Sequence, residues 1–183
     1  ISMALCPLLI KKLDERKAYI LLSVYGFAAS IFSFVIGHFW FQSPDNMVLT
    51  VLFYASLFLI GLQFGAVTLM PMIMTADCVD YYEYETGKRM EGAAYSILTL
   101  TIKVCLALGT AVGLIFVQVS GYYDALGAGT FTTKTKDIIF FAYTALPGVL
   151  ALLSIFPMFK YDIVGEKKAQ ISAALSQRRA GKE

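Results

Sequence analysis

Lys103 lies inside an apolar stretch, residues 95–119, that is long enough to cross a bilayer. A transmembrane helix needs about 20 mostly apolar residues, and an ionisable side chain near its middle costs roughly 2.5–3.5 kcal/mol on insertion scales. If the helix enters the membrane near Tyr95, Lys103 lies about 12 Å deep at about 1.5 Å per residue. This cost predicts a working site, in which a partner or a water-filled cavity offsets the charge. The other two interpretations are a lysine that snorkels from a helix end and a buried ion pair that only stabilises the fold.

Further polar side chains accompany Lys103 along one face of the predicted helix. At about 100° per residue they form a narrow stripe. Its members are Ser96, Thr99, Lys103, Thr110 and Gln118. Gly109 and Gly113 lie on a different face, where small residues allow another helix to approach closely. We therefore expect one face of this helix to line water or a ligand and another to pack against protein.

The elements that position this stripe are predicted to be membrane helices. Hydrophobic residues make up 58% of the 183-residue chain and charged residues 15%, whereas a typical soluble domain carries about 25% charged residues. Four full apolar spans are expected at residues 18–41, 47–74, 95–119 and 138–159, and a partial one at residues 1–10. We interpret the partial span as part of a longer protein. A signal peptide is the rival interpretation, but here the charged residues follow the apolar run. The expected fold class is an all-α polytopic membrane bundle.

The basic residues predict the orientation of these spans. Twelve of the fifteen Lys and Arg residues fall in residues 11–17, in the connection 75–93 and in the tail 160–183. The positive-inside rule then predicts a multi-pass cell-membrane protein with these segments and the C-terminus in the cytoplasm. Lipid is thus an expected partner, and the net charge of +2 gives no reason to expect nucleic acid. Through Ile171 and Leu175 the tail could lie on the inner leaflet as a short amphipathic helix; a solvated tail is the alternative.

The connection 75–93 concentrates charged side chains at the predicted cytoplasmic mouth. Asp77, Asp80 and Tyr81 would share one helical face. Such charges can pair with a partner domain in one conformation and release it in another, so we expect a cytoplasmic gate. Its candidate residues are Asp77, Asp80, Tyr81, Arg89 and Glu91. The alternatives are a solvated loop and a metal site built from Asp77 and Asp80, for which no third ligand is evident.

Catalytic and cofactor motifs give no support to an enzyme. The sequence has no glycine-rich phosphate loop, no Walker sequence and no nucleophile elbow, so neither ATP-driven transport nor hydrolysis is indicated. Cys6, Cys78 and Cys105 lack metal-type spacing and are expected to be free thiols. We expect no cofactor.

Several segments together resemble the glycoside–pentoside–hexuronide:cation symporters of the major facilitator superfamily. They are A-D-x-x-D-Y at residues 76–81, G-K-R-x-E-G at 87–92, Y-S at 95–96, Thr99, Lys103, and S-G-Y at 120–122. The resemblance covers the last five helices of such a protein. It implies a fold of two six-helix halves with a sugar site between them, so that this chain is the C-terminal part and the N-terminal half is its partner.

The resemblance also implies roles for individual residues. Lys103 matches a membrane-embedded lysine that interacts with an acidic cation site in the other half, and Thr99 matches a threonine one turn before it. Gln63 could bond to sugar hydroxyls or to another helix. The residues expected to take part in substrate binding and coupling are Lys103, Thr99, Ser96 and Gln63. The expected function is sugar symport coupled to Na⁺ or H⁺ by alternating access; an uncoupled channel and a sugar-binding receptor or scaffold are the alternatives.

Overall fold

The computed structural model describes residues 13–180, so the predicted partial span at residues 1–10 lies outside the described residues. Residues 13–180 form helices and no strands. The helices are α2 (Glu15–Gln42), α3 (Met47–Thr86), α4 (Glu91–Val119), α5 (Tyr122–Ala128), α6 (Thr133–Tyr143), α7 (Ala145–Leu153), α8 (Ile155–Met158) and α9 (Gly165–Ala180). In this part of the chain α2, α3, α4 and the series α6–α8 are each long and apolar enough to cross a membrane, which confirms the predicted all-α bundle of four full spans.

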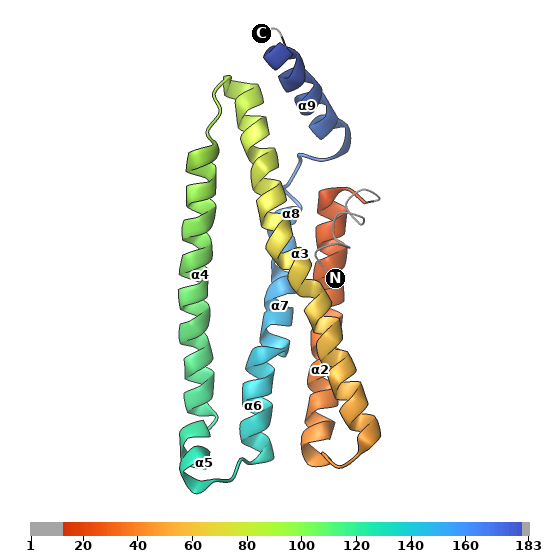
Figure 1. Cartoon of the computed structure of the whole chain (residues 1–183), viewed down its shortest axis with the longest axis vertical. Coiled ribbons are helices and arrows are strands. Elements are labelled where there is room, and N and C mark those ends of the chain that lie inside the picture. Colours follow the sequence, from red (N-terminus) through yellow and green to blue (C-terminus); the bar gives the residue numbers. More distant parts are fainter. Residues whose placement is uncertain (1–12, 181–183) are drawn as a thin grey trace.

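The long helices run side by side, and α9 lies beside the last turns of α3 (Figure 1). We call this end of the bundle the α9 end and the opposite one the α5 end. Contacts are densest where α2 packs on α3 and on α7, whereas α4 meets its neighbours mainly near its own two ends. The molecule is therefore a packed group of α2, α3 and α6–α8 with α4 standing beside it.

Small side chains form the contacts that hold α2 in this group. Apart from Glu15, the buried residues of α2 are Ala18, Ser23, Gly26, Ala29, Ser30, Ser33 and Gly37. A Cβ atom placed on Gly148 of α7 would lie only 2.6 Å from the Cβ atom of Ser30. The hydroxyls of Ser33 and Ser56 are 2.8 Å apart and join α2 to α3. Small residues and hydroxyl pairs of this kind are typical of helix contacts inside a bilayer.

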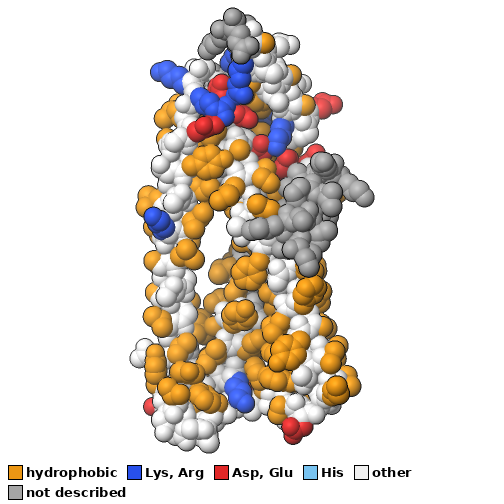
Figure 2. All heavy atoms as spheres, in the orientation of Figure 1, with side chains coloured by type: hydrophobic (Ala, Val, Ile, Leu, Met, Phe, Trp, Pro, Cys, Tyr) orange, Lys and Arg blue, Asp and Glu red, His pale blue; other side chains and the backbone are white. Residues whose placement is uncertain are grey.

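Large apolar side chains cover the outside of the bundle, while charged ones gather at the α9 end (Figure 2). Phe32, Phe39, Leu106 and Phe156 are among many that are exposed. In water this would be an unusually large apolar surface. It is the distribution expected of helices that contact lipid on the outside and pack through small residues on the inside.

α3 is longer than predicted. It begins at the cap residue Asn46, whose side chain accepts hydrogen bonds from the amides of Val48 and Leu49, and it continues for 40 residues until Gly87 adopts a left-handed conformation with φ of 71°. The prediction that residues 75–93 form a loop was therefore wrong, because only residues 87–90 separate α3 from α4. At about 1.5 Å per residue α3 is about 60 Å long, twice the roughly 30 Å hydrocarbon core.

The last predicted span is interrupted. Residues 133–158 form α6, α7 and α8, with breaks at Thr144 and Ser154. Pro147 has no amide hydrogen and so cannot donate to the carbonyl of Tyr143, which explains the first break. At this break the Thr144 hydroxyl donates to the carbonyl of Phe140 at 2.7 Å, beside the Thr144 amide, which donates to the same carbonyl at 2.9 Å.

The tail forms helix α9, and this helix lies against protein. Ile171 and Leu175 are 4% and 3% exposed because they face the rest of the chain, and α9 contacts α3. Neither a solvated tail nor an apolar face laid on the leaflet describes these residues. The packing expected at Gly109 and Gly113 is also not found among the described residues, since nothing lies within 4 Å of a Cβ atom placed there.

Candidate functional site

Three of the four predicted binding and coupling residues lie together on α4. Ser96, Thr99 and Lys103 line an open groove of about 430 Å³ near the α9 end, with Gly92, Tyr95 and Leu100. The Thr99 hydroxyl donates to the carbonyl of Tyr95 at 2.8 Å, one turn earlier in the helix. No residue of α4 is buried by the described part of the chain. The groove is thus a polar surface formed by one helix and left uncovered by residues 13–180.

Lys103 lies well inside α4 and is exposed. Twelve residues separate it from Glu91, so it is about 18 Å from the start of a helix about 43 Å long. Its ammonium group makes no ion pair or hydrogen bond within residues 13–180, and an ion pair that merely fixes the fold of this segment is therefore absent. An interior position also argues against snorkelling from a helix end.

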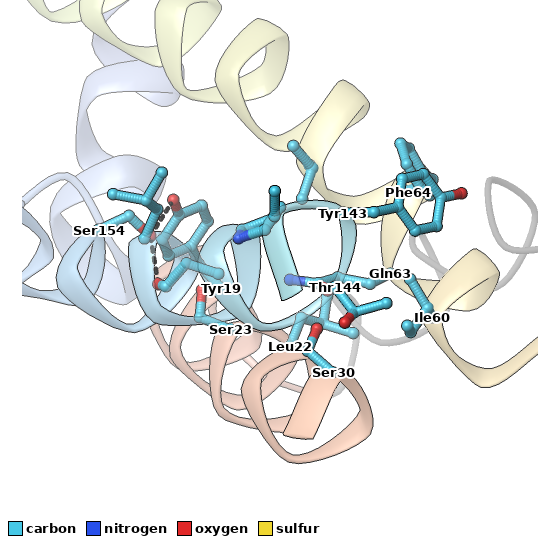
Figure 3. A pocket seen from close by; sticks show the side chains of 15 residues that line it. Tyr19, Leu22, Ser23, Ser30, Ile60, Gln63, Phe64, Tyr143, Thr144 and Ser154 are labelled. Carbon is cyan, nitrogen blue, oxygen red and sulfur yellow. Dashed lines mark hydrogen bonds between the residues drawn. The ribbon is translucent and has the colours of Figure 1, made fainter. Parts of the chain in front are cut away.

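Gln63 lies away from this groove. It lines a second, more enclosed cavity of about 550 Å³ between α2, α3, α6 and α7 (Figure 3). Its side chain packs against Gly26 of α2, where an added Cβ atom would lie 1.9 Å from the Gln63 amide carbon. Tyr19 donates to Ser154 at 2.8 Å at the edge of the same cavity. Gln63 therefore belongs to a different surface from Ser96, Thr99 and Lys103.

Asp77, one of the predicted gate residues, belongs to a buried cluster at the α9 end. Lys168 of α9 lies 2.7 Å from Asp77 Oδ1 and 2.7 Å from Glu15 Oε1. Tyr161 donates to the other oxygen of Asp77 at 3.0 Å. Asp77 and Glu15 are 7% and 8% exposed. One lysine thus joins the first turn of α2, the end of α3 and the tail.

Burial and ion pairing shift the pKa of Lys168 in opposite directions. Burial alone would lower the pKa of Lys168, but its hydrogen bonds to Asp77 and Glu15 outweigh that effect and raise the pKa. Burial, followed by the charge of Asp77, raises the pKa of Tyr161. Lys168 therefore stays charged and Tyr161 stays a neutral hydrogen-bond donor throughout the physiological range.

Three more of the predicted gate residues, Asp80, Arg89 and Glu91, form a second cluster around Arg89, in the turn between α3 and α4. Arg89 donates through Nη1 to Glu83 at 2.7 Å and to Asp80 at 3.3 Å, and through Nε to Glu91 at 2.8 Å. Glu83 also accepts from Arg179 of α9 at 3.0 Å. The hydrogen bonds from Arg89 to Glu91 and Glu83 raise the pKa of the guanidinium, and those from Arg89 and Arg179 lower the pKa of Glu83.

Tyr81 is close to this region but makes a different contact. Its ring lies under Lys167, whose nitrogen is 5.2 Å from the ring centroid. A metal site at Asp77 and Asp80 has no support, because the described residues contain no group of three metal-ligating side chains and both oxygens of Asp77 are bonded to Lys168 and Tyr161.

Sequence reasoning did not identify Glu15, Tyr161, Lys168 or Arg179 as members of these clusters. One signal was present: Lys168, Ile171 and Leu175 recur at helical spacing and form one face of the tail. That pattern indicates a packed helix with a buried cation. Nothing in the sequence around Glu15 distinguishes it from an ordinary exposed acid at the start of a helix.

Comparison with known proteins identifies the family. The MFS/sugar transport protein family matches residues 1–165. An uncharacterized 29.9 kDa protein of Pseudescherichia vulneris is 27% identical over 154 residues, which cover 84% of this chain and 54% of that protein. The inner membrane symporter YicJ of Escherichia coli K12 is 31% identical over 59% of this chain and 23% of its own length. The glucuronide carrier protein homolog of the same organism is 28% identical over 58% of this chain and 22% of its own.

These matches bear on the chain in three ways. The chain spans about half or less of the length of the curated relatives it matches. No solved structure matches it significantly. The named relatives are symporters and carriers rather than enzymes, and they confirm the resemblance to glycoside–pentoside–hexuronide symporters. This chain therefore belongs to the MFS/sugar transport protein family.

Proposed function

We propose that this chain supplies the C-terminal helices of a secondary active transporter that couples sugar uptake to Na⁺ or H⁺ by alternating access. The observation that carries the proposal is the groove on α4, where Lys103, Thr99 and Ser96 lie uncovered in the interior of a membrane-length helix. A lysine at that depth costs roughly 2.5–3.5 kcal/mol unless something outside residues 13–180 compensates it. Membership of a sugar transport family supports the view that the group compensating the Lys103 charge takes part in transport.

The compensating partner is an N-terminal six-helix half of the same protein. YicJ is about four times as long as the part of it that this chain matches, which leaves room for a partner of that size. α4 presents its polar groove to that half, which contributes acidic side chains. Lys103 pairs with those carboxylates when no cation is bound and is displaced when Na⁺ or a proton neutralises them. Cation binding thereby changes the neighbouring sugar site.

Sugar binding falls to the hydroxyl-bearing residues of the groove. Ser96 and Thr99 lie within two turns of Lys103 on one face, so a ligand that bonds to them also feels the lysine charge. Gln63 lies in the other cavity and has a supporting role in the packing of α2 on α3. The names of the relatives, which include a glucuronide carrier homolog, support a glycoside or hexuronide as the substrate class.

The α9 end is the cytoplasmic side of a cell membrane. Nine of the fifteen basic residues lie in described segments that reach this end, and basic loops stay in the cytoplasm. The clusters around Asp77 and Arg89 are then the cytoplasmic gate. Arg89 is shared by three carboxylates, those of Asp80, Glu83 and Glu91, with side chains 44%, 17% and 53% exposed. These carboxylates can exchange Arg89 for partners in the other half as the two halves rock about the site.

Uptake into proteoliposomes that contain the full-length parent protein tests this proposal. A panel of radiolabelled glycosides, pentoses and hexuronides is offered with and without an imposed Na⁺ or proton gradient. Lys103→Met should abolish gradient-driven accumulation of the accepted sugar. Thr99→Val should weaken it, whereas Thr101→Val should not, since Thr101 carries the same hydroxyl-to-backbone bond on a different face of α4.

The alternatives give different results in the same assay. An uncoupled channel would equilibrate sugar without accumulation and without saturation. A receptor or scaffold would bind sugar and move none. Normal coupled uptake by Lys103→Met would contradict the role given to the lysine.

A further inference from the structure

The tail helix α9 makes two kinds of contact with the rest of the chain. At its first turns Lys168 lies between two buried carboxylates, and Ile171 and Leu175 pack inward. At its last turns Arg178 donates to the carbonyl of Tyr84 at 2.9 Å and Arg179 pairs with Glu83. The carboxylates and apolar side chains of the first set are buried, whereas both arginines of the second set are exposed. The buried contacts therefore determine where α9 lies, and the exposed contacts depend on that placement.

Glu83 connects the tail to α4. One of its oxygens, Oε2, accepts from Arg179 at 3.0 Å and from Arg89 at 2.7 Å. Arg89 lies in the short turn before α4 and is bonded to Glu91, the first residue of α4. A continuous series of charged contacts thus runs from α9 through Glu83 and Arg89 to the helix that carries Lys103.

We propose that Arg179 is a positioning residue for α4: placed by the Lys168 anchor, it fixes Glu83, and Glu83 fixes Arg89 and the start of α4. The tail then sets the orientation of the α9 end of α4 relative to α3. Arg89 alone could pair with Asp80, Glu83 or Glu91, because all three carboxylates lie within its reach. A second arginine on Glu83 holds that side chain in the position where it meets Arg89, and so selects one arrangement of the turn.

The contacts of Arg179 and Arg89 with Glu83 are of a kind that ionic strength can weaken. The side chains of Arg179 and Arg89 are 55% and 40% exposed, so salt screens their attraction to Glu83. The Lys168 side chain is 36% exposed, but its partners Asp77 and Glu15 are more buried than Glu83, at 9% and 11% exposed against 17%, so the Lys168 contacts are less sensitive to salt. Raising the ionic strength should therefore loosen the start of α4 while α9 stays docked. The consequence for coupled transport rests on the proposed function, but the positioning itself does not.

Pulsed electron paramagnetic resonance on the full-length parent protein tests the proposal without measuring transport. In a background free of native cysteines, one spin-label pair joins Ser172 of α9 to Tyr82 of α3 and reports docking of the tail. A second pair joins Ser172 to Ala93 of α4 and reports the placement of α4. All three positions are exposed in this structure.

Arg179→Gln should leave the α9–α3 distance distribution narrow and raise the displaced fraction of the α9–α4 pair about two- to fivefold, the range expected for an exposed ion pair. Sodium chloride at 1 M should produce the same displacement in the wild type. Arg179→Lys, which keeps the charge, should largely restore the wild-type distance distribution. Lys168→Met should broaden both distributions. Arg178→Gln is the matched control, since it removes the neighbouring charge without touching Glu83, and the α9–α4 distribution should stay narrow.

An unchanged α9–α4 distribution in Arg179→Gln would overturn the proposal. Equal broadening in Arg178→Gln would also overturn it, because the effect would then follow the charge of the tail rather than the contact with Glu83. Both variants change exposed side chains, so the comparison does not depend on a variant that fails to fold. If the transport assay failed while these distances behaved as expected, the proposed function would be wrong and the positioning role would stand.

Discussion

Replacing Lys168 with methionine measures how firmly the tail is held. The variant keeps a long apolar side chain but leaves Glu15 and Asp77 buried, with Tyr161 as the remaining side-chain donor to Asp77. Removing one partner of a buried ion pair costs about 3–5 kcal/mol. Water can reach the site, since the Lys168 side chain is 36% exposed, and this lowers the cost of leaving the two carboxylates without a cation. We therefore expect a loss of about 2–4 kcal/mol.

This loss should appear as local opening of α9. The helix is attached through few buried residues, so releasing it costs less than keeping two uncompensated carboxylates buried. At about 1.4 kcal/mol per tenfold change, amide hydrogen exchange in residues 165–180 should accelerate roughly 30- to 700-fold. Exchange in the middle of α2 should change little. Hydrogen exchange followed by mass spectrometry on the intact parent protein measures both segments in one experiment.

Lys167→Met is the matched control for this prediction. Lys167 is adjacent in sequence and carries the same charge, but its carboxylate partner Asp162 lies 3.5 Å away and is 80% exposed. An exposed pair contributes about 0.2–1 kcal/mol and the contact of Lys167 with the Tyr81 ring about 0.5–1 kcal/mol, so exchange in α9 should accelerate by no more than about 30-fold. If Lys168→Met stayed within that same small range, the buried cluster would not be what holds the tail, and the reasoning would be refuted.

Three further variants or conditions test other parts of the structure. Gly148→Ala should lower stability by about 1–3 kcal/mol because the new methyl group meets α2, whereas Gly109→Ala, which has open space in residues 13–180, should not; thermal unfolding compares them. His38→Leu should lower the unfolding temperature by removing the 2.9 Å partner of Asp137, whose other oxygen is already buried without a partner in the described chain, a cost of about 1–3 kcal/mol. The pKa of Glu83 is lowered, chiefly by the hydrogen bond from Arg89. The stabilisation that ionised Glu83 gives the folded state is therefore complete above the ordinary carboxyl pKa and is lost as the pH falls through the lowered pKa. The α9–α4 spin-label distribution should broaden below about pH 4 and not between pH 6 and 8.

The membrane helices could be predicted from the sequence because their signal is simple. Apolar runs of 20 or more residues have few other fates, and the bounds expected for 18–41 and 95–119 lie inside α2 and α4. The end of α3 was missed because charged residues after an apolar span look like a loop. In the structure those charges are satisfied by Arg89 and by α9, so the helix continues to Gly87.

The site was predictable only where its residues belong to one helix. Ser96, Thr99 and Lys103 follow from helical periodicity, and they do form one groove. Asp77 was selected for its charge, but its partners Lys168 and Glu15 lie far from it in sequence. No periodicity connects residues on three different elements, and the choice of partner depends on how those elements pack. The separation of Gln63 from the groove has the same origin.

The absence of buried residues on α4 has an evolutionary consequence. Within residues 13–180 almost any side chain on that helix is sterically acceptable. Under the proposed function, selection on α4 therefore acts through the partner half that covers it. Substitutions there should co-vary with positions outside this chain more than with positions inside it. A mutational scan of α4 would then give two different maps, a permissive one for the chain alone and a restrictive one for the whole protein, and the difference between them would outline the partner surface.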